Sequence, residues 1–468
     1  MASRENYFCS FKILNSKDNM NVNKISFVFF VMAAVFFPTY IFAQTDSTKT
    51  VLQQASLQDV INYALKNKPG VKQSLVDEEI GERDIKSALS GWLPQINADA
   101  SFNHNMKQQV NALTVDGQTS YMTLGTKNTS GITLQADQQL LNAGLIQASK
   151  SAKYYRQQYK QGTENTKITT VVEVSKAFYD ILTSQEQFKI IDENISRLEK
   201  QFKDAKAQYD AGLVDKTDFQ RAQISLSNAK ADRKRTQELL KFKYAYLKSI
   251  IGYDASKDLS LMFHEKGMEQ EVLLDTAQVL NYNNRIEYKQ LETQRQLQQI
   301  NTSYNKLAYM PKLSAFANYS WNYMNNDFKN LYKESYPGSM AGLKLSIPIF
   351  QGTKRTQEIR KSQLLEKRID LDLENTRNQI NSQYEQAMAT YKAGLNDWKT
   401  ANENQEISKQ VYGTIKLQYD EGIKTYLDLM TAETDLRTSQ LNYLNALYSL
   451  LSAKLDVQQA LGTITITQ

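Results

Sequence analysis

The stretch Tyr209-Asp210-Ala211-Gly212, followed by Asp218, returns 210 positions later as Tyr419-Asp420-Glu421-Gly422, followed by Asp428. Two further motifs keep the same offset: Ile251-Gly252 and Leu461-Gly462. A period of this length is that of a whole domain and not of a solenoid repeat. The sequence therefore predicts an internal tandem duplication, in which one structural unit is used twice.

A long helix is predicted upstream of each repeated motif. From Gly144 to Tyr209 there is no proline and only one interior glycine, Gly162, and apolar residues step by three and four. At 1.5 Å per residue, such a helix is on the order of 100 Å long. Its counterpart in the second half runs between Gly352 and Tyr419.

A coiled-coil seam runs along the C-terminal segment, where small and apolar residues recur at alternating spacings of three and four. Its members are Leu429, Ala432, Leu436, Ser439, Tyr443, Ala446, Leu450, Ala453, Val457 and Ala460. A second seam, from Leu441 to Leu455, lies roughly 150° around the helix at 100° per residue. Two seams are expected for a helix with a neighbour on each side in the wall of a closed helical barrel. The alternative is a core helix in a large bundle.

Between the helical tracts, the hydrophobic period changes to two, which is typical of one-sided β-strands. The apolar positions are Ile96, Ala98, Ala100 and Phe102; Ile132, Leu134 and Ala136; Leu313, Ala315, Ala317, Tyr319, Trp321 and Tyr323; and Leu343, Leu345, Ile347 and Ile349. Each segment has about the 9–11 residues that a tilted strand needs to cross a bilayer, although a soluble sandwich would use the same alternation. The polar connections 107–130 and 325–339 are expected to be outward loops.

Four strands cannot close into a barrel, and open sheet edges are not tolerated in lipid. Three copies would supply 12 strands, an even number within the range of bacterial outer-membrane barrels. The sequence therefore predicts an α+β membrane protein, in which four strands per chain complete a trimeric 12-stranded transmembrane β-barrel.

The N-terminal segment has the pattern of a secretory signal peptide, because Lys24 precedes an apolar run over 25–37 and Ala43 follows it as a cleavage residue. About 13 apolar residues are too few for a membrane-spanning helix, which needs roughly 20. We expect residues 1–43 to be cleaved, with Met20 as an alternative start.

The composition argues against several kinds of site. The only cysteine, Cys9, lies upstream of the apolar run, and the two histidines, His104 and His264, lie far apart. We therefore expect no disulfide, no metal site and no cofactor. The basic residues are interspersed with acids along helical stretches, so the net charge of +6 does not indicate nucleic-acid binding. Since no nucleophile pairs with a histidine and no phosphate-binding loop is found, we do not expect an enzyme.

These features together resemble the TolC-like family of outer membrane efflux proteins (outer membrane factors), over nearly the whole mature chain. They include the duplication and the strand pair in each half. They also include Leu93-Pro94 and Met310-Pro311, where a helix is expected to give way to a strand. The sequences Leu141-Asn142-Ala143-Gly144 and Phe350-Gln351-Gly352, where the chain is expected to return to helix, and the paired Tyr-Asp-X-Gly turns complete the set. The resemblance implies a homotrimer whose barrel in the outer membrane continues into a long periplasmic α-helical barrel of coiled-coil helices. It also implies two partners, a periplasmic adaptor (membrane fusion protein) and an inner-membrane pump.

The expected divisions of the chain follow the repeat. The first repeat comprises a periplasmic helix (44–95), a transmembrane β-hairpin (96–140) and a long helical hairpin (141–272). The second repeat comprises the same three parts over 273–311, 312–350 and 351–468.

In the family, the two Gly turns lie at the periplasmic tips of the helical hairpins, where the adaptor docks and a network of contacts closes the entrance. Carried over position by position, the docking tips fall on Gly212, Leu213, Gly422 and Ile423. The periplasmic gate falls on Thr217, Asp218, Tyr419, Lys424 and Asp428. Within it, Asp218 is expected to pair with Tyr419 and Thr217 with Lys424, and Asp428 is expected to form a constricting acidic ring.

This chain departs from the family member compared at two positions: Lys424 replaces an arginine and Thr431 replaces an acid, so a second acidic ring is not expected. A structural role also competes with gating. Thr217 with Gln220, and Thr425 with Asp428, fit capping boxes that would start helices. The two turn glycines fit left-handed helix C-caps in the same way.

The sequence thus predicts the outer membrane channel of a tripartite efflux or type I secretion system, a passive exit duct gated at its periplasmic end. The alternative is a soluble periplasmic coiled-coil scaffold or adaptor protein, which would lack the period-two segments. The cargo stays open between drugs, metals and secreted protein.

Overall fold

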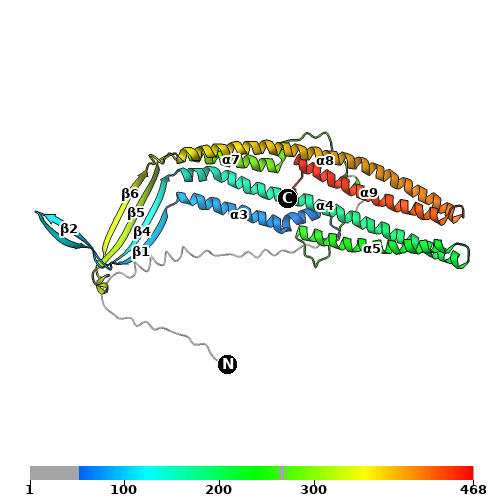
Figure 1. Ribbon diagram of the computed structural model, residues 1–468, viewed down its shortest axis with the longest axis horizontal. Helices are drawn as coiled ribbons and strands as arrows, with labels where there is room; N and C mark the ends of the chain where they lie inside the picture. The colour runs from blue at the N-terminus through cyan, green and yellow to red at the C-terminus, as the bar shows by residue number, and fades with distance from the viewer. Residues whose placement is uncertain (1–51, 263–267, 270, 467–468) are drawn as a thin grey trace, which may run out of the picture. The chain divides into compact units, whose positions relative to one another are not determined.

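The computed structural model describes residues 52–262, 268–269 and 271–466, so the expected signal peptide lies outside the described residues. Within them, each half has one or two helices, then two strands of the main sheet, then two long helices (Figure 1). The helices of the first half are α2 (Leu57–Asn67), α3 (Pro69–Leu89), α4 (Ala143–Asp210) and α5 (Lys216–Ile251). Those of the second half are α7 (Ile286–Leu307), α8 (Lys354–Asp420) and α9 (Tyr426–Leu461). Three single 3-10 turns are η1 (Ser90–Trp92), η2 (Tyr282–Asn284) and η3 (Phe328–Asn330).

The two longest helices form where the sequence has no proline. α4 has 68 residues and α8 has 67, which corresponds to about 100 Å each. α4 begins where the Asn142 side chain accepts a hydrogen bond from Gly144 N at 2.8 Å. The prediction of an uninterrupted helix from Gly144 to Tyr209 is confirmed.

Four strands form one antiparallel sheet in the order β1-β4-β5-β6, so the last strand of the first half pairs with the first strand of the second. Their bounds are β1 (Gln95–His104), β4 (Asn128–Leu141), β5 (Lys312–Asn325) and β6 (Tyr336–Ser346). The second-half alternation through Ile349 was expected to be strand, but β6 ends at Ser346, two residues before Pro348. Proline lacks the N–H that the ladder needs and restricts the residue before it.

The register of the sheet places the predicted apolar positions on one face. One row across the four strands is Ile96, Ala136, Ala317 and Ala341, and the next is Ala98, Leu134, Tyr319 and Ser339. The opposite face is mostly Asn, Asp, Gln, Ser, Thr and Gly. The apolar face is solvent-exposed in the single chain, with Ile96, Leu343 and Leu345 all more than half exposed. The alternation read from the sequence is therefore confirmed as a one-sided sheet.

The expectation of a loop over 107–130 is wrong, because this connection contains a second two-stranded sheet, β2 (Gln109–Val115) and β3 (Gln118–Leu124). Asp116 and Gly117 join the strands with φ values of +51° and +78°. Two consecutive residues with positive φ are the requirement of a type I′ hairpin turn, for which Asp-Gly is a preferred pair. The second-half connection contains only η3.

The long helices pack in the order α5–α4–α9–α8, since α4 contacts both α5 and α9, and α9 contacts α8. α3 and α7 cover the strand-proximal part by packing on α4, and α7 also packs on α8. The outer helices α5 and α8 carry exposed apolar side chains, including Leu239, Phe242, Leu364 and Leu371. Exposed apolar patches of this kind mark surfaces for further association.

Two glycines explain why Ile251-Gly252 and Leu461-Gly462 recur. Each ends a helix with a positive φ, +70° at Gly252 and +69° at Gly462. A Cβ at Gly252 would lie 2.7 Å from Asn67 O, and one at Gly462 would lie 2.8 Å from Asn284 C. Only glycine fits a position that combines a left-handed backbone with such close backbone contact.

The largest buried cluster joins side chains of α2, α4, α5 and α9 with those of the segment after α5 and with Tyr391 of α8. Across the described ranges, no helix combines the length and apolarity needed to span a membrane. In the same ranges, no group of three or more His, Cys, Asp or Glu side chains could hold a metal ion.

Candidate functional site

The two hairpin tips end their first helix with the same backbone turn. Gly212 has a φ of +73° and Gly422 a φ of +74°. Leu213 N donates to Gln208 O at 2.9 Å, and Ile423 N donates to Gln418 O at 2.8 Å. This is the pattern of a Schellman C-cap, in which the left-handed glycine lets the chain satisfy the last helical carbonyls. The C-cap interpretation of both glycines is confirmed.

The return helices start differently. Asp215 is the N-cap of α5, and its side chain accepts from Thr217 N at 3.0 Å, so the predicted capping box of Thr217 and Gln220 is wrong. The reason is that Asp215, two residues earlier, already supplies the acceptor that the first turn needs. α9 starts with the predicted reciprocal box, in which Thr425 Oγ1 accepts from Asp428 N and the Asp428 carboxylate accepts from Thr425 N.

Tyr419 lies in an apolar cluster that joins the two hairpins. The cluster consists of Ala205 and Phe202 of α4, Ala222 of α5, Tyr419 of α8, and Tyr426 and Met430 of α9. The rings of Tyr419 and Tyr426 meet edge to face with centroids 6.3 Å apart. Burial raises the pKa of Tyr419, and the carboxylates of Asp204 and Asp218 raise it further. The Asp218 charge thus acts on Tyr419 within one chain, whereas the side chain that hydrogen-bonds to Tyr419 is Gln208 of α4.

The other predicted gate residues are distributed around the tip. Thr217 is exposed, and no hydrogen bond joins it to Lys424 within the described part of the single chain. Lys424 is exposed beside Asp428. The hydrogen bonds from Thr425 hold the pKa of Asp428 below its usual value, and the Lys424 charge lowers it slightly more.

The predicted docking residues project from the turns. Leu213 is 76% exposed and Ile423 is 72% exposed, although both are large aliphatic side chains. A Schellman turn often packs this residue back on its own helix, and the two exposures show that neither side chain does so.

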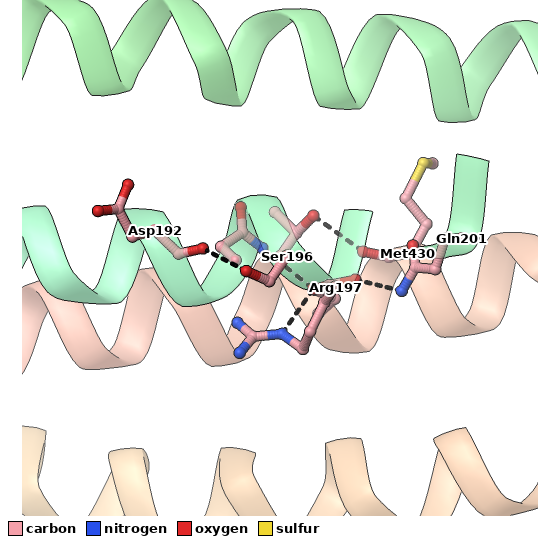
Figure 2. A network of polar contacts seen from close by, with 8 residues as sticks. Asp192, Ser196, Arg197, Gln201 and Met430 are labelled. Carbon is pink, nitrogen blue, oxygen red and sulfur yellow. Dashed lines mark hydrogen bonds and ion pairs between the residues drawn. The ribbon is translucent and has the colours of Figure 1, made fainter. Parts of the chain in front are cut away.

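A buried polar cluster lies further from the tip, and the sequence prediction missed it. The Glu433 side chain of α9 is 3% exposed. Its carboxylate accepts from Asn194 Nδ2 at 3.0 Å, Arg197 Nε at 2.8 Å and Gln201 Nε2 at 2.5 Å, all on α4. Figure 2 shows Arg197 and Gln201 within this network. We call these four residues the Glu433 clamp.

A sequence signal for the clamp was present. Glu433 lies directly beside the apolar seam, next to Ala432 and three positions before Leu436, and its three donors step by three and four along α4, as residues on one helical face do. A charged residue that is buried beside a seam needs a partner on the facing helix. Breaking such a buried pair by removing one partner costs about 3–5 kcal/mol.

Comparisons with known proteins agree with this architecture. The sequence model of the family described as outer membrane efflux protein matches residues 60–253 and 277–463. The outer membrane protein TolC of Vibrio cholerae serotype O1 is 21% identical over 434 residues, which covers 92% of this chain and 95% of that protein.

Two solved structures share the fold. The structure of CusC, described in terms of folding and transmembrane channel formation, aligns with a TM-score of 0.70 at 15% identity and covers 90% of this chain and 95% of that one. The Campylobacter jejuni CmeC outer membrane channel aligns with a TM-score of 0.69 at 15% identity and covers 97% and 94%. Because the family model matches most of both halves, the chain belongs to the outer membrane efflux protein family.

Proposed function

We propose that three copies of this chain form the outer membrane channel of a tripartite efflux or type I secretion system. In this proposal, the tandem duplication supplies each copy with four barrel strands and two helical hairpins. The twelve strands close a barrel in the outer membrane, and the helices continue it as a tunnel across the periplasm. The channel is a passive duct, served by a periplasmic adaptor and an inner-membrane pump.

One observation carries the proposal: the four-stranded sheet has an apolar face across every strand and two unpaired edges, on β1 and β6. In lipid, unpaired edge groups cost several kcal/mol each, so the edges must pair with those of other copies. A soluble scaffold or adaptor has no use for such a face. The outer helices support the same assembly, since exposed apolar side chains on α5 and α8 would meet across each boundary between copies.

The experiment is outer-membrane fractionation followed by gel migration with and without heating. We expect a heat-modifiable trimer in the outer membrane that conducts ions in planar bilayers. A mature chain recovered as a soluble monomer would overturn the proposal.

The gate is part of the proposal. The Asp218 charge acts on Tyr419, which supports their pairing in the gate, and Lys424 is exposed where a neighbouring hairpin could reach it with Thr217. In the proposed closed state each of these contacts would be a hydrogen bond worth about 0.5–1.5 kcal/mol. Tyr419→Phe combined with Lys424→Ser should therefore raise single-channel conductance. If the assembled double variant had the conductance of the parent, these residues would not belong to the gate. Asp428→Ala should chiefly weaken cation binding at the entrance.

The adaptor is proposed to dock on the turns, because Leu213 and Ile423 are exposed apolar residues at the tip. Leu213→Glu and Ile423→Glu should abolish export while the trimer stays in the membrane. Loss of the trimer in either variant would instead assign these side chains to the fold.

A further inference from the structure

The connection between β5 and β6, residues 326–335, folds back over the end of the apolar sheet face that lies farthest from the helices. The last row of that face consists of Phe102, Ser130 and Tyr323. The Phe328 ring meets the Phe102 ring edge to face, with centroids 5.7 Å apart. The Tyr332 ring meets the Tyr323 ring in the same way at 5.2 Å, and its hydroxyl donates to Ser130 Oγ at 3.3 Å. We call residues 326–335 the rim loop.

The rim loop is held in place by its own contacts. The Asp327 carboxylate accepts from Lys329 N at 3.1 Å and from Asn330 Nδ2 at 2.9 Å. Asn325 Nδ2, at the end of β5, donates to Asn330 O at 3.4 Å. Leu331, at the centre of the loop, is only 1% exposed. The loop therefore has a small core of its own and a defined position on the sheet.

The surface of the rim loop combines exposed aromatic rings with exposed ammonium groups. Phe328 is 60% exposed and Tyr332 is 58% exposed, although each also contacts the sheet. Lys329 and Lys333 are both exposed, and neither ammonium group takes part in an ion pair within the part of the chain that the structure describes. These two positive charges are available to an external anion.

The two acids of the rim loop accept hydrogen bonds from neutral groups and not from these ammonium groups. Asp327 caps the single turn η3 as described above. Glu334 Oε2 accepts from Tyr336 OH at 2.9 Å. Both carboxylates are therefore used to shape the loop and the start of β6.

In the proposed trimer, on which this inference rests, the apolar face lies in the hydrocarbon of the outer membrane. Its end farthest from the helices then lies at the level of the outer headgroups. Aromatic side chains gather at this level because their rings are amphipathic. Lysines at the same level are attracted to anionic headgroups. A ligand that satisfies both features of the rim loop has acyl chains and phosphate groups in one molecule.

We propose that the rim loop is a binding site for a phosphorylated lipid of the outer leaflet. The acyl chains of this lipid contact Phe328 and Tyr332 beside the apolar face, and its phosphates pair with Lys329 and Lys333. The first-half connection lacks this arrangement, because it forms the separate β2–β3 hairpin. Each copy therefore has one such site, at the end of its second pair of strands.

The test titrates detergent-purified trimers with fluorescent lipid A, an acylated and phosphorylated disaccharide. Lys329→Gln combined with Lys333→Gln should weaken binding at least tenfold, the change that ~1.4 kcal/mol produces. Lys107→Gln is the matched control, because Lys107 is an exposed lysine of the first-half connection. It should bind lipid A like the parent. Equal losses from Lys107→Gln and from the double variant would contradict a defined site on the rim loop.

A second variant tests the rings without changing charge. Phe328→Ala combined with Tyr332→Ala keeps both lysines but removes the contacts with Phe102 and Tyr323, so it should also weaken binding of lipid A at least tenfold. Parent affinity in either double variant would overturn the inference.

Two further measurements identify the ligand and separate the two proposals. Inorganic phosphate in large excess should not displace lipid A, and displacement would show a site for free phosphate instead of lipid. An assembled parent trimer that binds lipid A no better than phosphatidylcholine would overturn this inference alone. A parent chain that forms no trimer in the outer membrane would instead overturn the proposed function.

Discussion

The first hairpin tip starts its return helix with the Asp215 side chain alone, whereas the second starts it with the reciprocal pair of Thr425 and Asp428. The preceding turns are nearly the same, since both use a left-handed glycine and the same two backbone hydrogen bonds. The common part is imposed by the backbone, because a tight reversal after a long helix needs a residue that tolerates positive φ. The start of the return helix differs because it depends on which side chain caps it.

Because the two return helices are capped differently, capping and the proposed gating fall on different residues at the first tip but on the same residue at the second. At the first tip, the Asp215 side chain supplies the cap, so in the proposed gate the carboxylate of Asp218 can pair with Tyr419. At the second tip, Asp428 caps α9 and is also the residue proposed for the acidic ring. A substitution at Asp428 therefore changes the helix start and the entrance charge together.

The largest expected effect is loss of the trimer when an arginine is placed on the apolar face of the sheet, and it tests whether the two halves are equivalent in the membrane. Ala136 of the first half and Ala317 of the second are register partners on the apolar face, so they lie at the same depth. Ala136→Arg and Ala317→Arg should each abolish trimer recovery from membranes, because a lipid-facing arginine at midplane costs about 2–4 kcal/mol in each copy.

The matched controls are the adjacent register pair on the opposite face, Gln135→Arg and Asn318→Arg. Both should give nearly parent amounts of trimer. Equal loss from both faces would remove the argument from alternation, and loss from only one half would show that the halves are not equivalent.

The second comparison concerns the glycines. Gly252→Ala and Gly462→Ala should lower the thermal stability of the trimer more than Gly212→Ala and Gly422→Ala. All four lose the left-handed preference of glycine, about 1–2 kcal/mol. Only the first pair also forces a Cβ against backbone, since nothing lies within 4 Å of a Cβ built at the two tips. The measurement is the temperature at which the purified trimer dissociates.

Gly413→Ala is the control for the glycine series, because this residue lies inside α8 with open space around it. It should leave stability unchanged or raise it by up to about 1 kcal/mol. Equal losses at Gly212 and Gly252 would show that close packing adds nothing to the cost of the turn.

A smaller effect is expected at the helix starts. Asp215→Ala and Thr425→Ala each remove a cap and should cost about 1 kcal/mol. Thr217→Ala should cost much less, because only its backbone N–H takes part in the cap. The same dissociation temperature measures all three. A Thr217→Ala loss as large as that of Asp215→Ala would return the capping role to Thr217.

The sequence predicted the helices and strands whose apolar residues recur with one regular period. α4 has no proline and a regular seam, and the strands of the main sheet alternate strictly, so both could be read directly. The β2–β3 hairpin was missed because its apolar residues lie on both faces. Val110 and Tyr121 lie on one face and Leu113 and Met122 on the other, so no one-sided alternation appears. The Asp116-Gly117 turn was the available signal.

At the candidate site, motif spacing predicted the helix caps less well, because neighbouring side chains compete to cap the same first turn. Thr217 with Gln220 fits the capping-box spacing, yet Asp215 reaches the first turn earlier. The members of the Glu433 clamp lie more than 230 positions apart in the chain, so spacing alone could not pair them. Which hairpin faces which is fixed by the packing of the two halves and not by any local pattern.

The smallest predicted effect concerns pH at the second tip. The hydrogen bonds from Thr425 lower the pKa of Asp428 in the folded chain below its ordinary value of 3.8. A carboxyl with a depressed folded pKa contributes stability above its unfolded pKa and loses that contribution as pH falls through the folded value. The difference in dissociation temperature between the parent and Thr425→Ala should therefore be full at pH 7 and shrink below about pH 4. Gly413→Ala, which changes no titratable group, serves as a reference for general acid destabilisation of the trimer. If the Thr425→Ala difference stayed constant down to pH 2, the ionised Asp428 carboxylate would have no part in the box, and its charge would be free for the entrance alone.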